Sequence, residues 1–223
     1  MLYFVPTPIG NLKDITLRAL ELFETRSVFF CEDTRNFKKL LNVYKISLKW
    51  KEISPFHAYS SSNMAAKIAH RGLKEDVVIV SEAWTPGLSD PGKEIIKWAY
   101  EYKTPFEILP GANALIPAVV AACFDTSKFV FKGFLPSKKG LTKKINEIVT
   151  SPIPVFVYES VHRVSSTLGR IKETWFNRKV FLARELTKKF EQKECGQIDM
   201  ILDKIDNGAI PQMWEFVLGF EWM

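Results

Sequence analysis

The sequence of 223 residues contains little cysteine, histidine and glycine, and it has no long apolar run. Cys31, Cys123 and Cys195 are far apart and odd in number, so we expect neither a disulfide framework nor a zinc site. No apolar run approaches the ~18 residues of a membrane span, and the N-terminus lacks the pattern of a signal peptide. These absences predict a protein of the reducing cytoplasm with no membrane partner.

Several catalytic motifs are also missing. There is no Gly-x-Ser-x-Gly, His-Glu-x-x-His or P-loop pattern, and the histidines lack metal-ligand spacing, so we predict no metal site. The loop after residues 2–5 has one glycine, Gly10, where a dinucleotide fingerprint has three, which argues against a Rossmann nucleotide site. Pro6 and Pro8 suit the wall of a pocket, although a tight turn before a capped helix would have the same composition.

The first half of the chain alternates strand and helix patterns, which is typical of a largely parallel α/β sheet. Apolar runs predict strands at residues 2–5, 27–31, 53–56, 77–80 and 106–109. Helical spacing predicts helices at residues 14–24, 34–42, 61–71 and 93–102, with Asp14 as the N-cap of the first.

The pattern changes after an Ala-rich segment at residues 112–123, which we expect to be a linking helix. Strands are predicted at residues 129–131, 155–158, 180–183 and 216–220, among two or three helices, and residues 190–195 could form another strand or hairpin arm. The predicted fold class is therefore α/β with two domains. Residues 1–112 would hold a mostly parallel sheet, and residues 113–223 a mixed sheet.

Positive charge is concentrated in the middle of the chain. Residues 128–193 contain 15 Lys or Arg against 5 Asp or Glu, whereas the whole chain has a net charge of only +6. A basic segment of this kind is the footprint expected for a polyanion partner, although a solvated basic face with no partner remains an alternative.

Residues 80–92 form an unusual loop after a predicted buried strand. Gly87 and Gly92 allow the backbone to approach a ligand closely, and Pro86 and Pro91 fix the shape of the loop. Loops at the carboxyl ends of strands are where open α/β sheets bind ligands. The loop therefore predicts a binding site, and Trp84 is out of place in it.

Polar residues also follow three other predicted strands, at residues 31–35, 158–163 and 183–189. In the first group, Glu32 or Asp33 could bind a ligand or simply cap the next helix, and Arg35 could contact a phosphate or close a salt bridge. The other two groups lie in the basic segment, where Arg163, Arg184 and Lys188 are suited to phosphate contacts.

Taken in order, these segments resemble the ribosomal RNA small subunit methyltransferase I family of the tetrapyrrole methylase superfamily. The resemblance covers nearly the whole chain and is carried by short motifs: Leu2 to Leu12, Asp14 to Leu20, Glu32 to Arg35, Val80 to Gly92, Pro110-Gly111, Gly133 to Pro136, Tyr158 to Arg163, and Ala183 to Lys189. It implies a homodimeric methyltransferase that binds S-adenosyl-L-methionine in a cleft between its domains. The implied substrate is the ribose 2′-hydroxyl of a cytidine in small-subunit (16S) ribosomal RNA, within the 30S subunit.

The resemblance also assigns residues. The implied cofactor contacts are Pro8, Ile9, Glu82, Ala83, Thr85, Gly87, Asn113, Ala114, Tyr158 and Leu186. A ribose hydroxyl is a weak nucleophile, so a base or a stabiliser of the developing oxyanion should help, and we place Glu159, Glu185 and Arg184 in that role. The expected RNA contacts are Arg35, Arg163, Lys188, Lys138 and Lys139.

The chain departs from the family at two glycine positions, which are Trp84 and Trp214 here. A source that reads UGA codons as glycine would explain both, and so would a diverged paralogue with an altered cofactor pocket. Two other functions therefore stay open: methylation of a corrin or other tetrapyrrole, and RNA binding without activity because the cofactor site is blocked.

Overall fold

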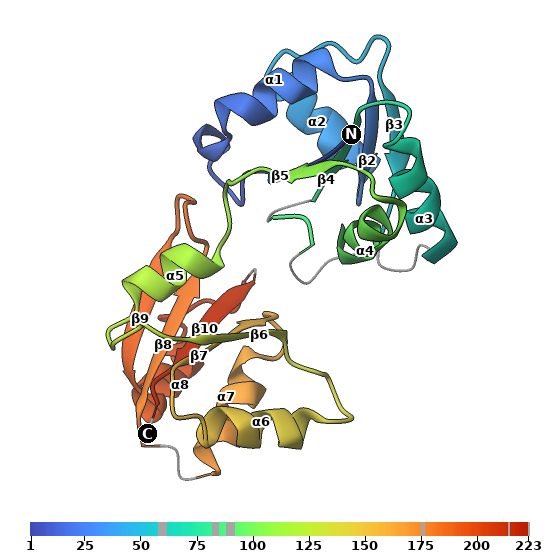
Figure 1. The fold of residues 1–223 in the computed structure, drawn as a ribbon. Coiled ribbons are helices and arrows are strands. Elements are labelled where there is room, and N and C mark those ends of the chain that lie inside the picture. The colour runs from blue at the N-terminus through green and yellow to red at the C-terminus, as the bar shows by residue number, and fades with distance from the viewer. Residues whose placement is uncertain (58–61, 82–84, 88–91, 175–176, 214, 223) are drawn as a thin grey trace. The chain divides into compact units, whose positions relative to one another are not determined.

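The structure of the chain is a computed structural model that describes residues 1–223 except 58–61, 82–84, 88–91, 175–176, 214 and 223. The chain forms two compact units, Met1–Asn113 and Ala114–Met223. Each unit has one β-sheet with helices packed on it (Figure 1). Residues 82–84 and 88–91 of the predicted ligand loop fall outside the described residues, and so do Trp84 and Trp214.

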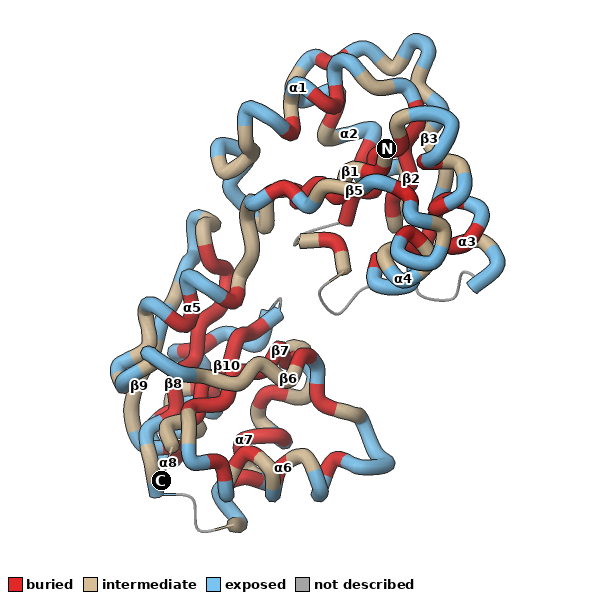
Figure 2. Tube along the Cα trace, viewed as in Figure 1, coloured by how far each residue is buried: buried red, intermediate tan, exposed pale blue. Residues whose placement is uncertain are grey.

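The sheet of the first unit is five-stranded and parallel throughout, with the strand order β3-β2-β4-β1-β5. Its strands are β1 (Leu2–Val5), β2 (Val28–Cys31), β3 (Glu52–Pro55), β4 (Val77–Val80) and β5 (Phe106–Ile108). The central strands β2 and β4 are buried along their whole length, because helices cover both faces of the sheet (Figure 2). This burial explains why they appear in the sequence as continuous apolar runs.

Two pairs of helices cover the two faces of this sheet. One apolar core joins the sheet to α3 (Ser62–Arg71) and α4 (Gly92–Tyr102), and a second core joins it to α1 (Leu17–Thr25) and α2 (Thr34–Val43). The first helix starts later than the sequence predicted. Thr16, not Asp14, is its N-cap and accepts a hydrogen bond from the Ala19 amide at 3.1 Å, whereas Asp14 lies in a short 3₁₀ turn, η1 (Leu12–Asp14).

The second unit has a mixed five-stranded sheet with the order β6-β7-β10-β8-β9. Strand β6 runs parallel to β7, while β10 is antiparallel to both β7 and β8, and β9 is antiparallel to β8. The strands are β6 (Val130–Phe134), β7 (Val155–Glu159), β8 (Lys179–Arg184), β9 (Gln192–Gln197) and β10 (Phe216–Phe220). The predicted fold class, a parallel sheet followed by a mixed sheet, is confirmed.

Three amphipathic helices share one apolar core with this sheet: α6 (Leu141–Val149), α7 (Val164–Lys172) and α8 (Ile198–Asp206). The Ala-rich segment becomes helix α5 (Leu115–Ala121), which is shorter than predicted and contacts β10. No helix among the described residues is long and apolar enough to cross a membrane.

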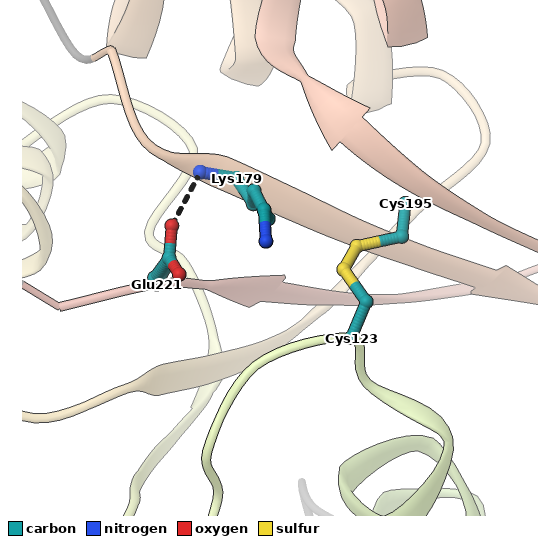
Figure 3. The surroundings of a disulfide bond; sticks show 4 residues. All are labelled: Cys123, Lys179, Cys195 and Glu221. Carbon is teal, nitrogen blue, oxygen red and sulfur yellow. Dashed lines mark hydrogen bonds between the residues drawn. A yellow bond between two sulfur atoms is a disulfide. The ribbon is translucent and has the colours of Figure 1, made fainter.

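The cysteine prediction is corrected by a disulfide. Cys123 follows α5 and Cys195 lies on β9, and the structure joins their sulfur atoms (Figure 3). The two residues are 72 positions apart, but the fold brings their Cα atoms within 6.2 Å, a separation at which a bond can form. Sequence spacing alone could not reveal this pairing, because it depends on where α5 meets the sheet.

Candidate functional site

One candidate site lies at the carboxyl edge of the parallel sheet of the first unit, where the loops after β1, β4 and β5 leave the strands. The Thr7 hydroxyl donates to the Ser81 carbonyl at 2.8 Å and so ties the first loop to the loop after β4. A Cβ atom on Gly111 would lie only 2.9 Å from Cβ of Pro6, which shows how closely the loop after β5 packs against the first loop. Glycine is required there because a larger residue would push the two loops apart.

The predicted cofactor residues that can be described in this unit belong to these loops. Pro8, Ile9, Thr85, Gly87 and Asn113 are all half-buried. Gly87 has a φ of 96°, in the left-handed region that favours glycine, as expected for a turn that exposes its backbone to a ligand. Glu82 and Ala83 lie outside the described residues.

A small pocket of about 90 Å³ opens at the same edge. Thr7, Pro8 and Ser81 line it together with Cys31, from the predicted group at residues 31–35, and Asn36, which lies just outside that group. Cys31 is the last residue of β2, so the same strand end could have identified Asn36.

Asp33, one of the two acidic residues after β2, has structural partners. Asp33 is the N-cap of α2 and accepts from the Arg35 amide at 2.7 Å, so the capping alternative is confirmed. The Arg35 guanidinium, 2.9 Å from the Asp33 carboxylate, lowers the pKa of that carboxyl to about 2. The Arg35 side chain is nevertheless 85% exposed, so it forms a salt bridge and still faces solvent.

A second candidate site lies within the other unit, at the edge of the mixed sheet where β6, β7 and β8 end and β10 begins. Phe216 of β10 pairs with Glu159 on one side and with Arg184 on the other. The register therefore places the ends of β7 and β8 on the two sides of one strand. Two of the sequence-predicted groups, residues 158–163 and 183–189, are thus brought together although about 25 residues separate them along the chain.

Glu159 is completely buried and both of its oxygens have partners. Oε1 accepts from the Ser160 amide at 2.8 Å, and Oε2 accepts from the Thr167 hydroxyl at 2.8 Å and from Arg163 at 3.1 Å. Arg163 also donates to the Leu135 and Pro136 carbonyls, at 3.0 and 3.3 Å. These contacts bind the ends of β6 and β7 to the start of α7, so Glu159 and Arg163 have the environment of positioning residues.

Glu185 has different surroundings. It is mostly buried, follows β8 directly and has a φ of 53°, an uncommon conformation for a residue with a side chain. Its Oε1 atom accepts from Lys188 Nζ at 2.7 Å. Neighbouring Arg184 is 5% exposed, and its Nε atom is buried without a hydrogen-bond partner among the described residues. A buried donor of this kind is suited to bind an incoming oxygen atom.

The remaining predicted residues of this unit differ in exposure. Tyr158 and Leu186 are buried and Ala114 is half-buried, and burial raises the pKa of Tyr158 to about 12. The hydroxyl of Tyr158 therefore stays protonated at neutral pH. Lys138 and Lys139 are exposed in the turn before α6, far along the chain from the other groups.

The geometry defines a two-unit α/β protein with loop-built sites at the strand ends, and comparison with known proteins gives its family. Residues 1–201 match the family of Tetrapyrrole (Corrin/Porphyrin) Methylases, so the chain belongs to that family. The predicted methyltransferase class and its methyl donor, S-adenosylmethionine, are confirmed by this membership.

Two relatives and one solved structure show the extent of the similarity. The ribosomal RNA small subunit methyltransferase I of Helicobacter pylori (strain ATCC 700392 / 26695) is 37% identical over 98% of this chain and 82% of its own length. The protein of the same name from Mycoplasmopsis pulmonis (strain UAB CTIP) is 39% identical over 92% of this chain and 91% of its own. A uroporphyrin-III C-methyltransferase from Thermus thermophilus, crystallised with S-adenosylhomocysteine, has the same fold, with a TM-score of 0.63 and 12% identity over 99% of this chain and 96% of its own.

Proposed function

We propose that this chain transfers a methyl group from S-adenosylmethionine to the ribose 2′-hydroxyl of a cytidine in small-subunit (16S) ribosomal RNA. The observation that carries the substrate class is the identity of 37–39% with two proteins named for that RNA, over at least 92% of this chain. The concentration of positive charge in residues 128–193 supports a polyanionic substrate. Tetrapyrroles also carry carboxylates, so the charge alone does not choose between the substrates; we favour RNA because identity to the uroporphyrin-III C-methyltransferase is only 12%.

The residues present fit the cofactor. The loops after β1, β4 and β5 pack together, and the left-handed backbone of Gly87 lies so close to Ile96 that a Cβ atom there would be 3.1 Å from Ile96 Cδ1. In this proposal Pro8, Ile9, Thr85, Gly87 and Asn113 contact the cofactor from the first unit. Ala114, Tyr158 and Leu186 contact it from the second unit.

Acid–base catalysis in this reaction concerns a single proton, that of the ribose hydroxyl. The sulfonium of the bound cofactor activates its own methyl group, so the protein aligns the two reacting atoms and excludes water. Glu185 accepts the hydroxyl proton as the oxygen attacks. Lys188 holds the carboxylate through Oε1, which leaves Oε2 as the accepting atom. The unpartnered Nε of Arg184 donates to the developing negative oxygen.

Glu159 is assigned a positioning role, because both of its oxygens already accept hydrogen bonds. Arg35, Lys138 and Lys139 contact phosphates through exposed cations, and Lys188 lies close enough to Glu185 to guide the backbone of the target nucleotide. We propose that the protein acts as a homodimer on the 30S subunit.

The test is methyl transfer to isolated small subunits, with mapping of the modified nucleotide. Glu185→Gln should lower kcat by about 100-fold or more, the usual contribution of a general base. Glu194→Gln is a matched control, since Glu194 is also ion-paired, to Lys204 at 2.6 Å, but lies on β9 away from the strand ends. If Glu159→Gln and Glu185→Gln both retained full turnover, a carboxylate base would be excluded.

The cofactor-blocked alternative has its own test in calorimetry with S-adenosylmethionine. This chain and its Trp84→Gly variant are titrated side by side. Binding by both would exclude a blocked site, whereas binding by the Trp84→Gly variant alone would show that the tryptophan side chain blocks it.

A further inference from the structure

The loop between β8 and β9 encloses a pocket that none of the assignments above explains. Its volume is about 800 Å³, within the range of small-molecule and nucleotide sites. Arg184 and Glu185 line one part of it, and Lys189, Phe190 and Met213 line another. The pocket therefore continues directly from the residues to which we assign the reaction.

Two large apolar side chains that line this pocket are exposed to solvent. The Phe190 side chain is 66% exposed and Met213 is 55% exposed, although large apolar side chains are normally covered. The ammonium of Lys189 lies 5.4 Å from the centre of the Phe190 ring. An exposed aromatic ring beside a lysine is the kind of surface on which unpaired nucleobases stack.

The loop that carries Phe190 has a fixed shape. Thr187 has a φ of 67°, and its amide donates to Glu191 Oε2 at 2.6 Å. The Lys188 amide donates to the Glu185 carbonyl at 3.0 Å, and the Glu191 amide donates to the Lys188 carbonyl at 3.2 Å. Because the loop is closed by its own hydrogen bonds, the backbone that carries the ring is ordered before any partner arrives, which lowers the entropy cost of binding.

The charges of the pocket favour an anionic partner. The carboxylates of Glu185 and Glu191 form ion pairs with Lys188 and Lys193. Among the residues that the structure describes, no ion pair engages Lys189, and Arg184 keeps a buried Nε donor. Positive charge is thus left over at a site with an exposed apolar ring. A purely apolar protein partner would leave these cations unpaired, whereas RNA supplies both a base and a phosphate.

We propose that this pocket binds an unpaired nucleobase next to the methylated nucleotide, stacked on Phe190, with Lys189 on its phosphate. The inference rests on the proposed function, because it assigns a substrate subsite to the same reaction. It adds a specificity determinant, since only RNA with an unstacked base at that position would fill the pocket.

The experiment compares Phe190→Ala, Phe190→Tyr and wild type in two assays. The first is binding of a fluorescein-labelled eight-residue oligoribocytidylate, and the second is methyl transfer to isolated small subunits. Phe190→Ala should weaken oligonucleotide binding by about 10-fold and raise KM more than it lowers kcat, because one stacking contact is lost. Phe190→Tyr should restore both values to within about 2-fold, since the ring is restored.

Tyr100→Ala is the matched control, because Tyr100 is a 72% exposed aromatic residue on α4 of the other unit. It should change neither value. Unaltered binding and KM in Phe190→Ala would overturn the stacking pocket while leaving the proposed methyl transfer in place. A shift of Phe190→Ala from dimer to monomer in size-exclusion chromatography would also overturn it, because Phe190 would then be covered by a second copy. Failure of the proposed function would appear separately, as absence of methyl transfer by the wild type.

Discussion

Trp50 has a backbone conformation that favours glycine. Its φ is 68° and its side chain is 83% exposed, so no burial of the ring offsets the strain. Lys45 and Lys103 also have positive φ, but each lies just after a helix, where this conformation is common. The family resemblance implies glycine at Trp84 and Trp214 as well, so Trp50 is a third tryptophan for which glycine is expected. The pattern favours UGA codons read as glycine over divergence of a paralogue.

Trp50→Gly should therefore stabilise the protein. A residue with a Cβ in the left-handed region costs roughly 1–2 kcal/mol, and glycine removes that cost while adding some entropy to the unfolded chain. We expect a gain of about 1 kcal/mol in the free energy of unfolding relative to Trp50→Ala, measured by urea denaturation. The alanine variant is the control, because it removes the ring but keeps the Cβ atom.

Genomic codons provide an independent check on the same prediction. We expect UGA at positions 50, 84 and 214. UGG codons at these positions would contradict the reassignment, whatever the stability of the glycine variants.

Elements of the first unit could be predicted well because their signals are local. Strands such as β1 and β4 are continuous apolar runs, and the structure has them at the predicted residues. The features that the sequence did not predict depend on long-range packing or on an unusual backbone conformation. Strand β6 extends beyond the predicted residues to Phe134, through a register shift between Phe131 and Phe134 where Gly133 has a φ of 64°. The disulfide likewise depends on long-range packing between α5 and β9.

The disulfide should make the stability of the oxidised protein depend on reductant. It closes a loop of 72 residues, for which the loss of unfolded-state entropy corresponds to about 4 kcal/mol. We expect reduction to lower the free energy of unfolding of the wild type by up to that amount, measured by denaturation with and without dithiothreitol.

A variant with Cys123→Ser and Cys195→Ser together is the control and should not respond to dithiothreitol. Titration of three free thiols in the oxidised, denatured wild type would contradict the disulfide, because only Cys31 lies outside the bond.

The Glu147 carboxylate joins helix α6 to β6, and its ionisation should make the free energy of unfolding depend on pH. Glu147 accepts from Lys132 at 2.6 Å and from Lys144 at 2.9 Å, and these partners lower its pKa from 4.5 to about 2. A lowered folded-state pKa gives stability that is present above 4.5 and is lost as the pH falls toward 2. Glu147→Gln should therefore be less stable than wild type at pH 7, and the difference should vanish near pH 2.

Thermal unfolding across pH 2–7 measures this difference. Lys132→Met should remove most of the pH dependence attributed to Glu147, because the nearer partner is lost. A stability difference between wild type and Glu147→Gln that is the same at pH 7 and pH 2 would contradict the assignment.

At the scale of the whole molecule, the candidate catalytic residues and the basic segment both lie in the second unit. The sequence placed the polar groups at strand ends correctly, because the carboxyl ends of parallel strands are recognisable from local patterns. It could not tell Glu159 from Glu185, since both follow a strand and stand near cations. Only the fold shows that the oxygens of Glu159 are both occupied while Oε1 alone of Glu185 is bound by Lys188. The basic segment, by contrast, is evident from the sequence alone: residues 128–193, with 15 Lys or Arg against 5 Asp or Glu, lie within the second unit.

The basic segment leads to a prediction of how RNA affinity depends on salt concentration. Each phosphate contact contributes about 0.7–0.9 to the slope of log affinity against log salt concentration. Changing Lys138 and Lys139 together to glutamine should reduce the steepness of that slope by roughly 1.4–1.8 for binding to small-subunit RNA. Filter binding between 50 and 200 mM salt, roughly the range over which such contacts dominate, measures the slope.

The matched control changes Lys38 and Lys39 together, because they are another exposed adjacent pair, on α2 of the first unit. Because both double variants lose the same formal charge, an equal reduction in slope would show that net charge alone acts. A reduction confined to the Lys138 and Lys139 variant would support direct phosphate contacts by these two lysines.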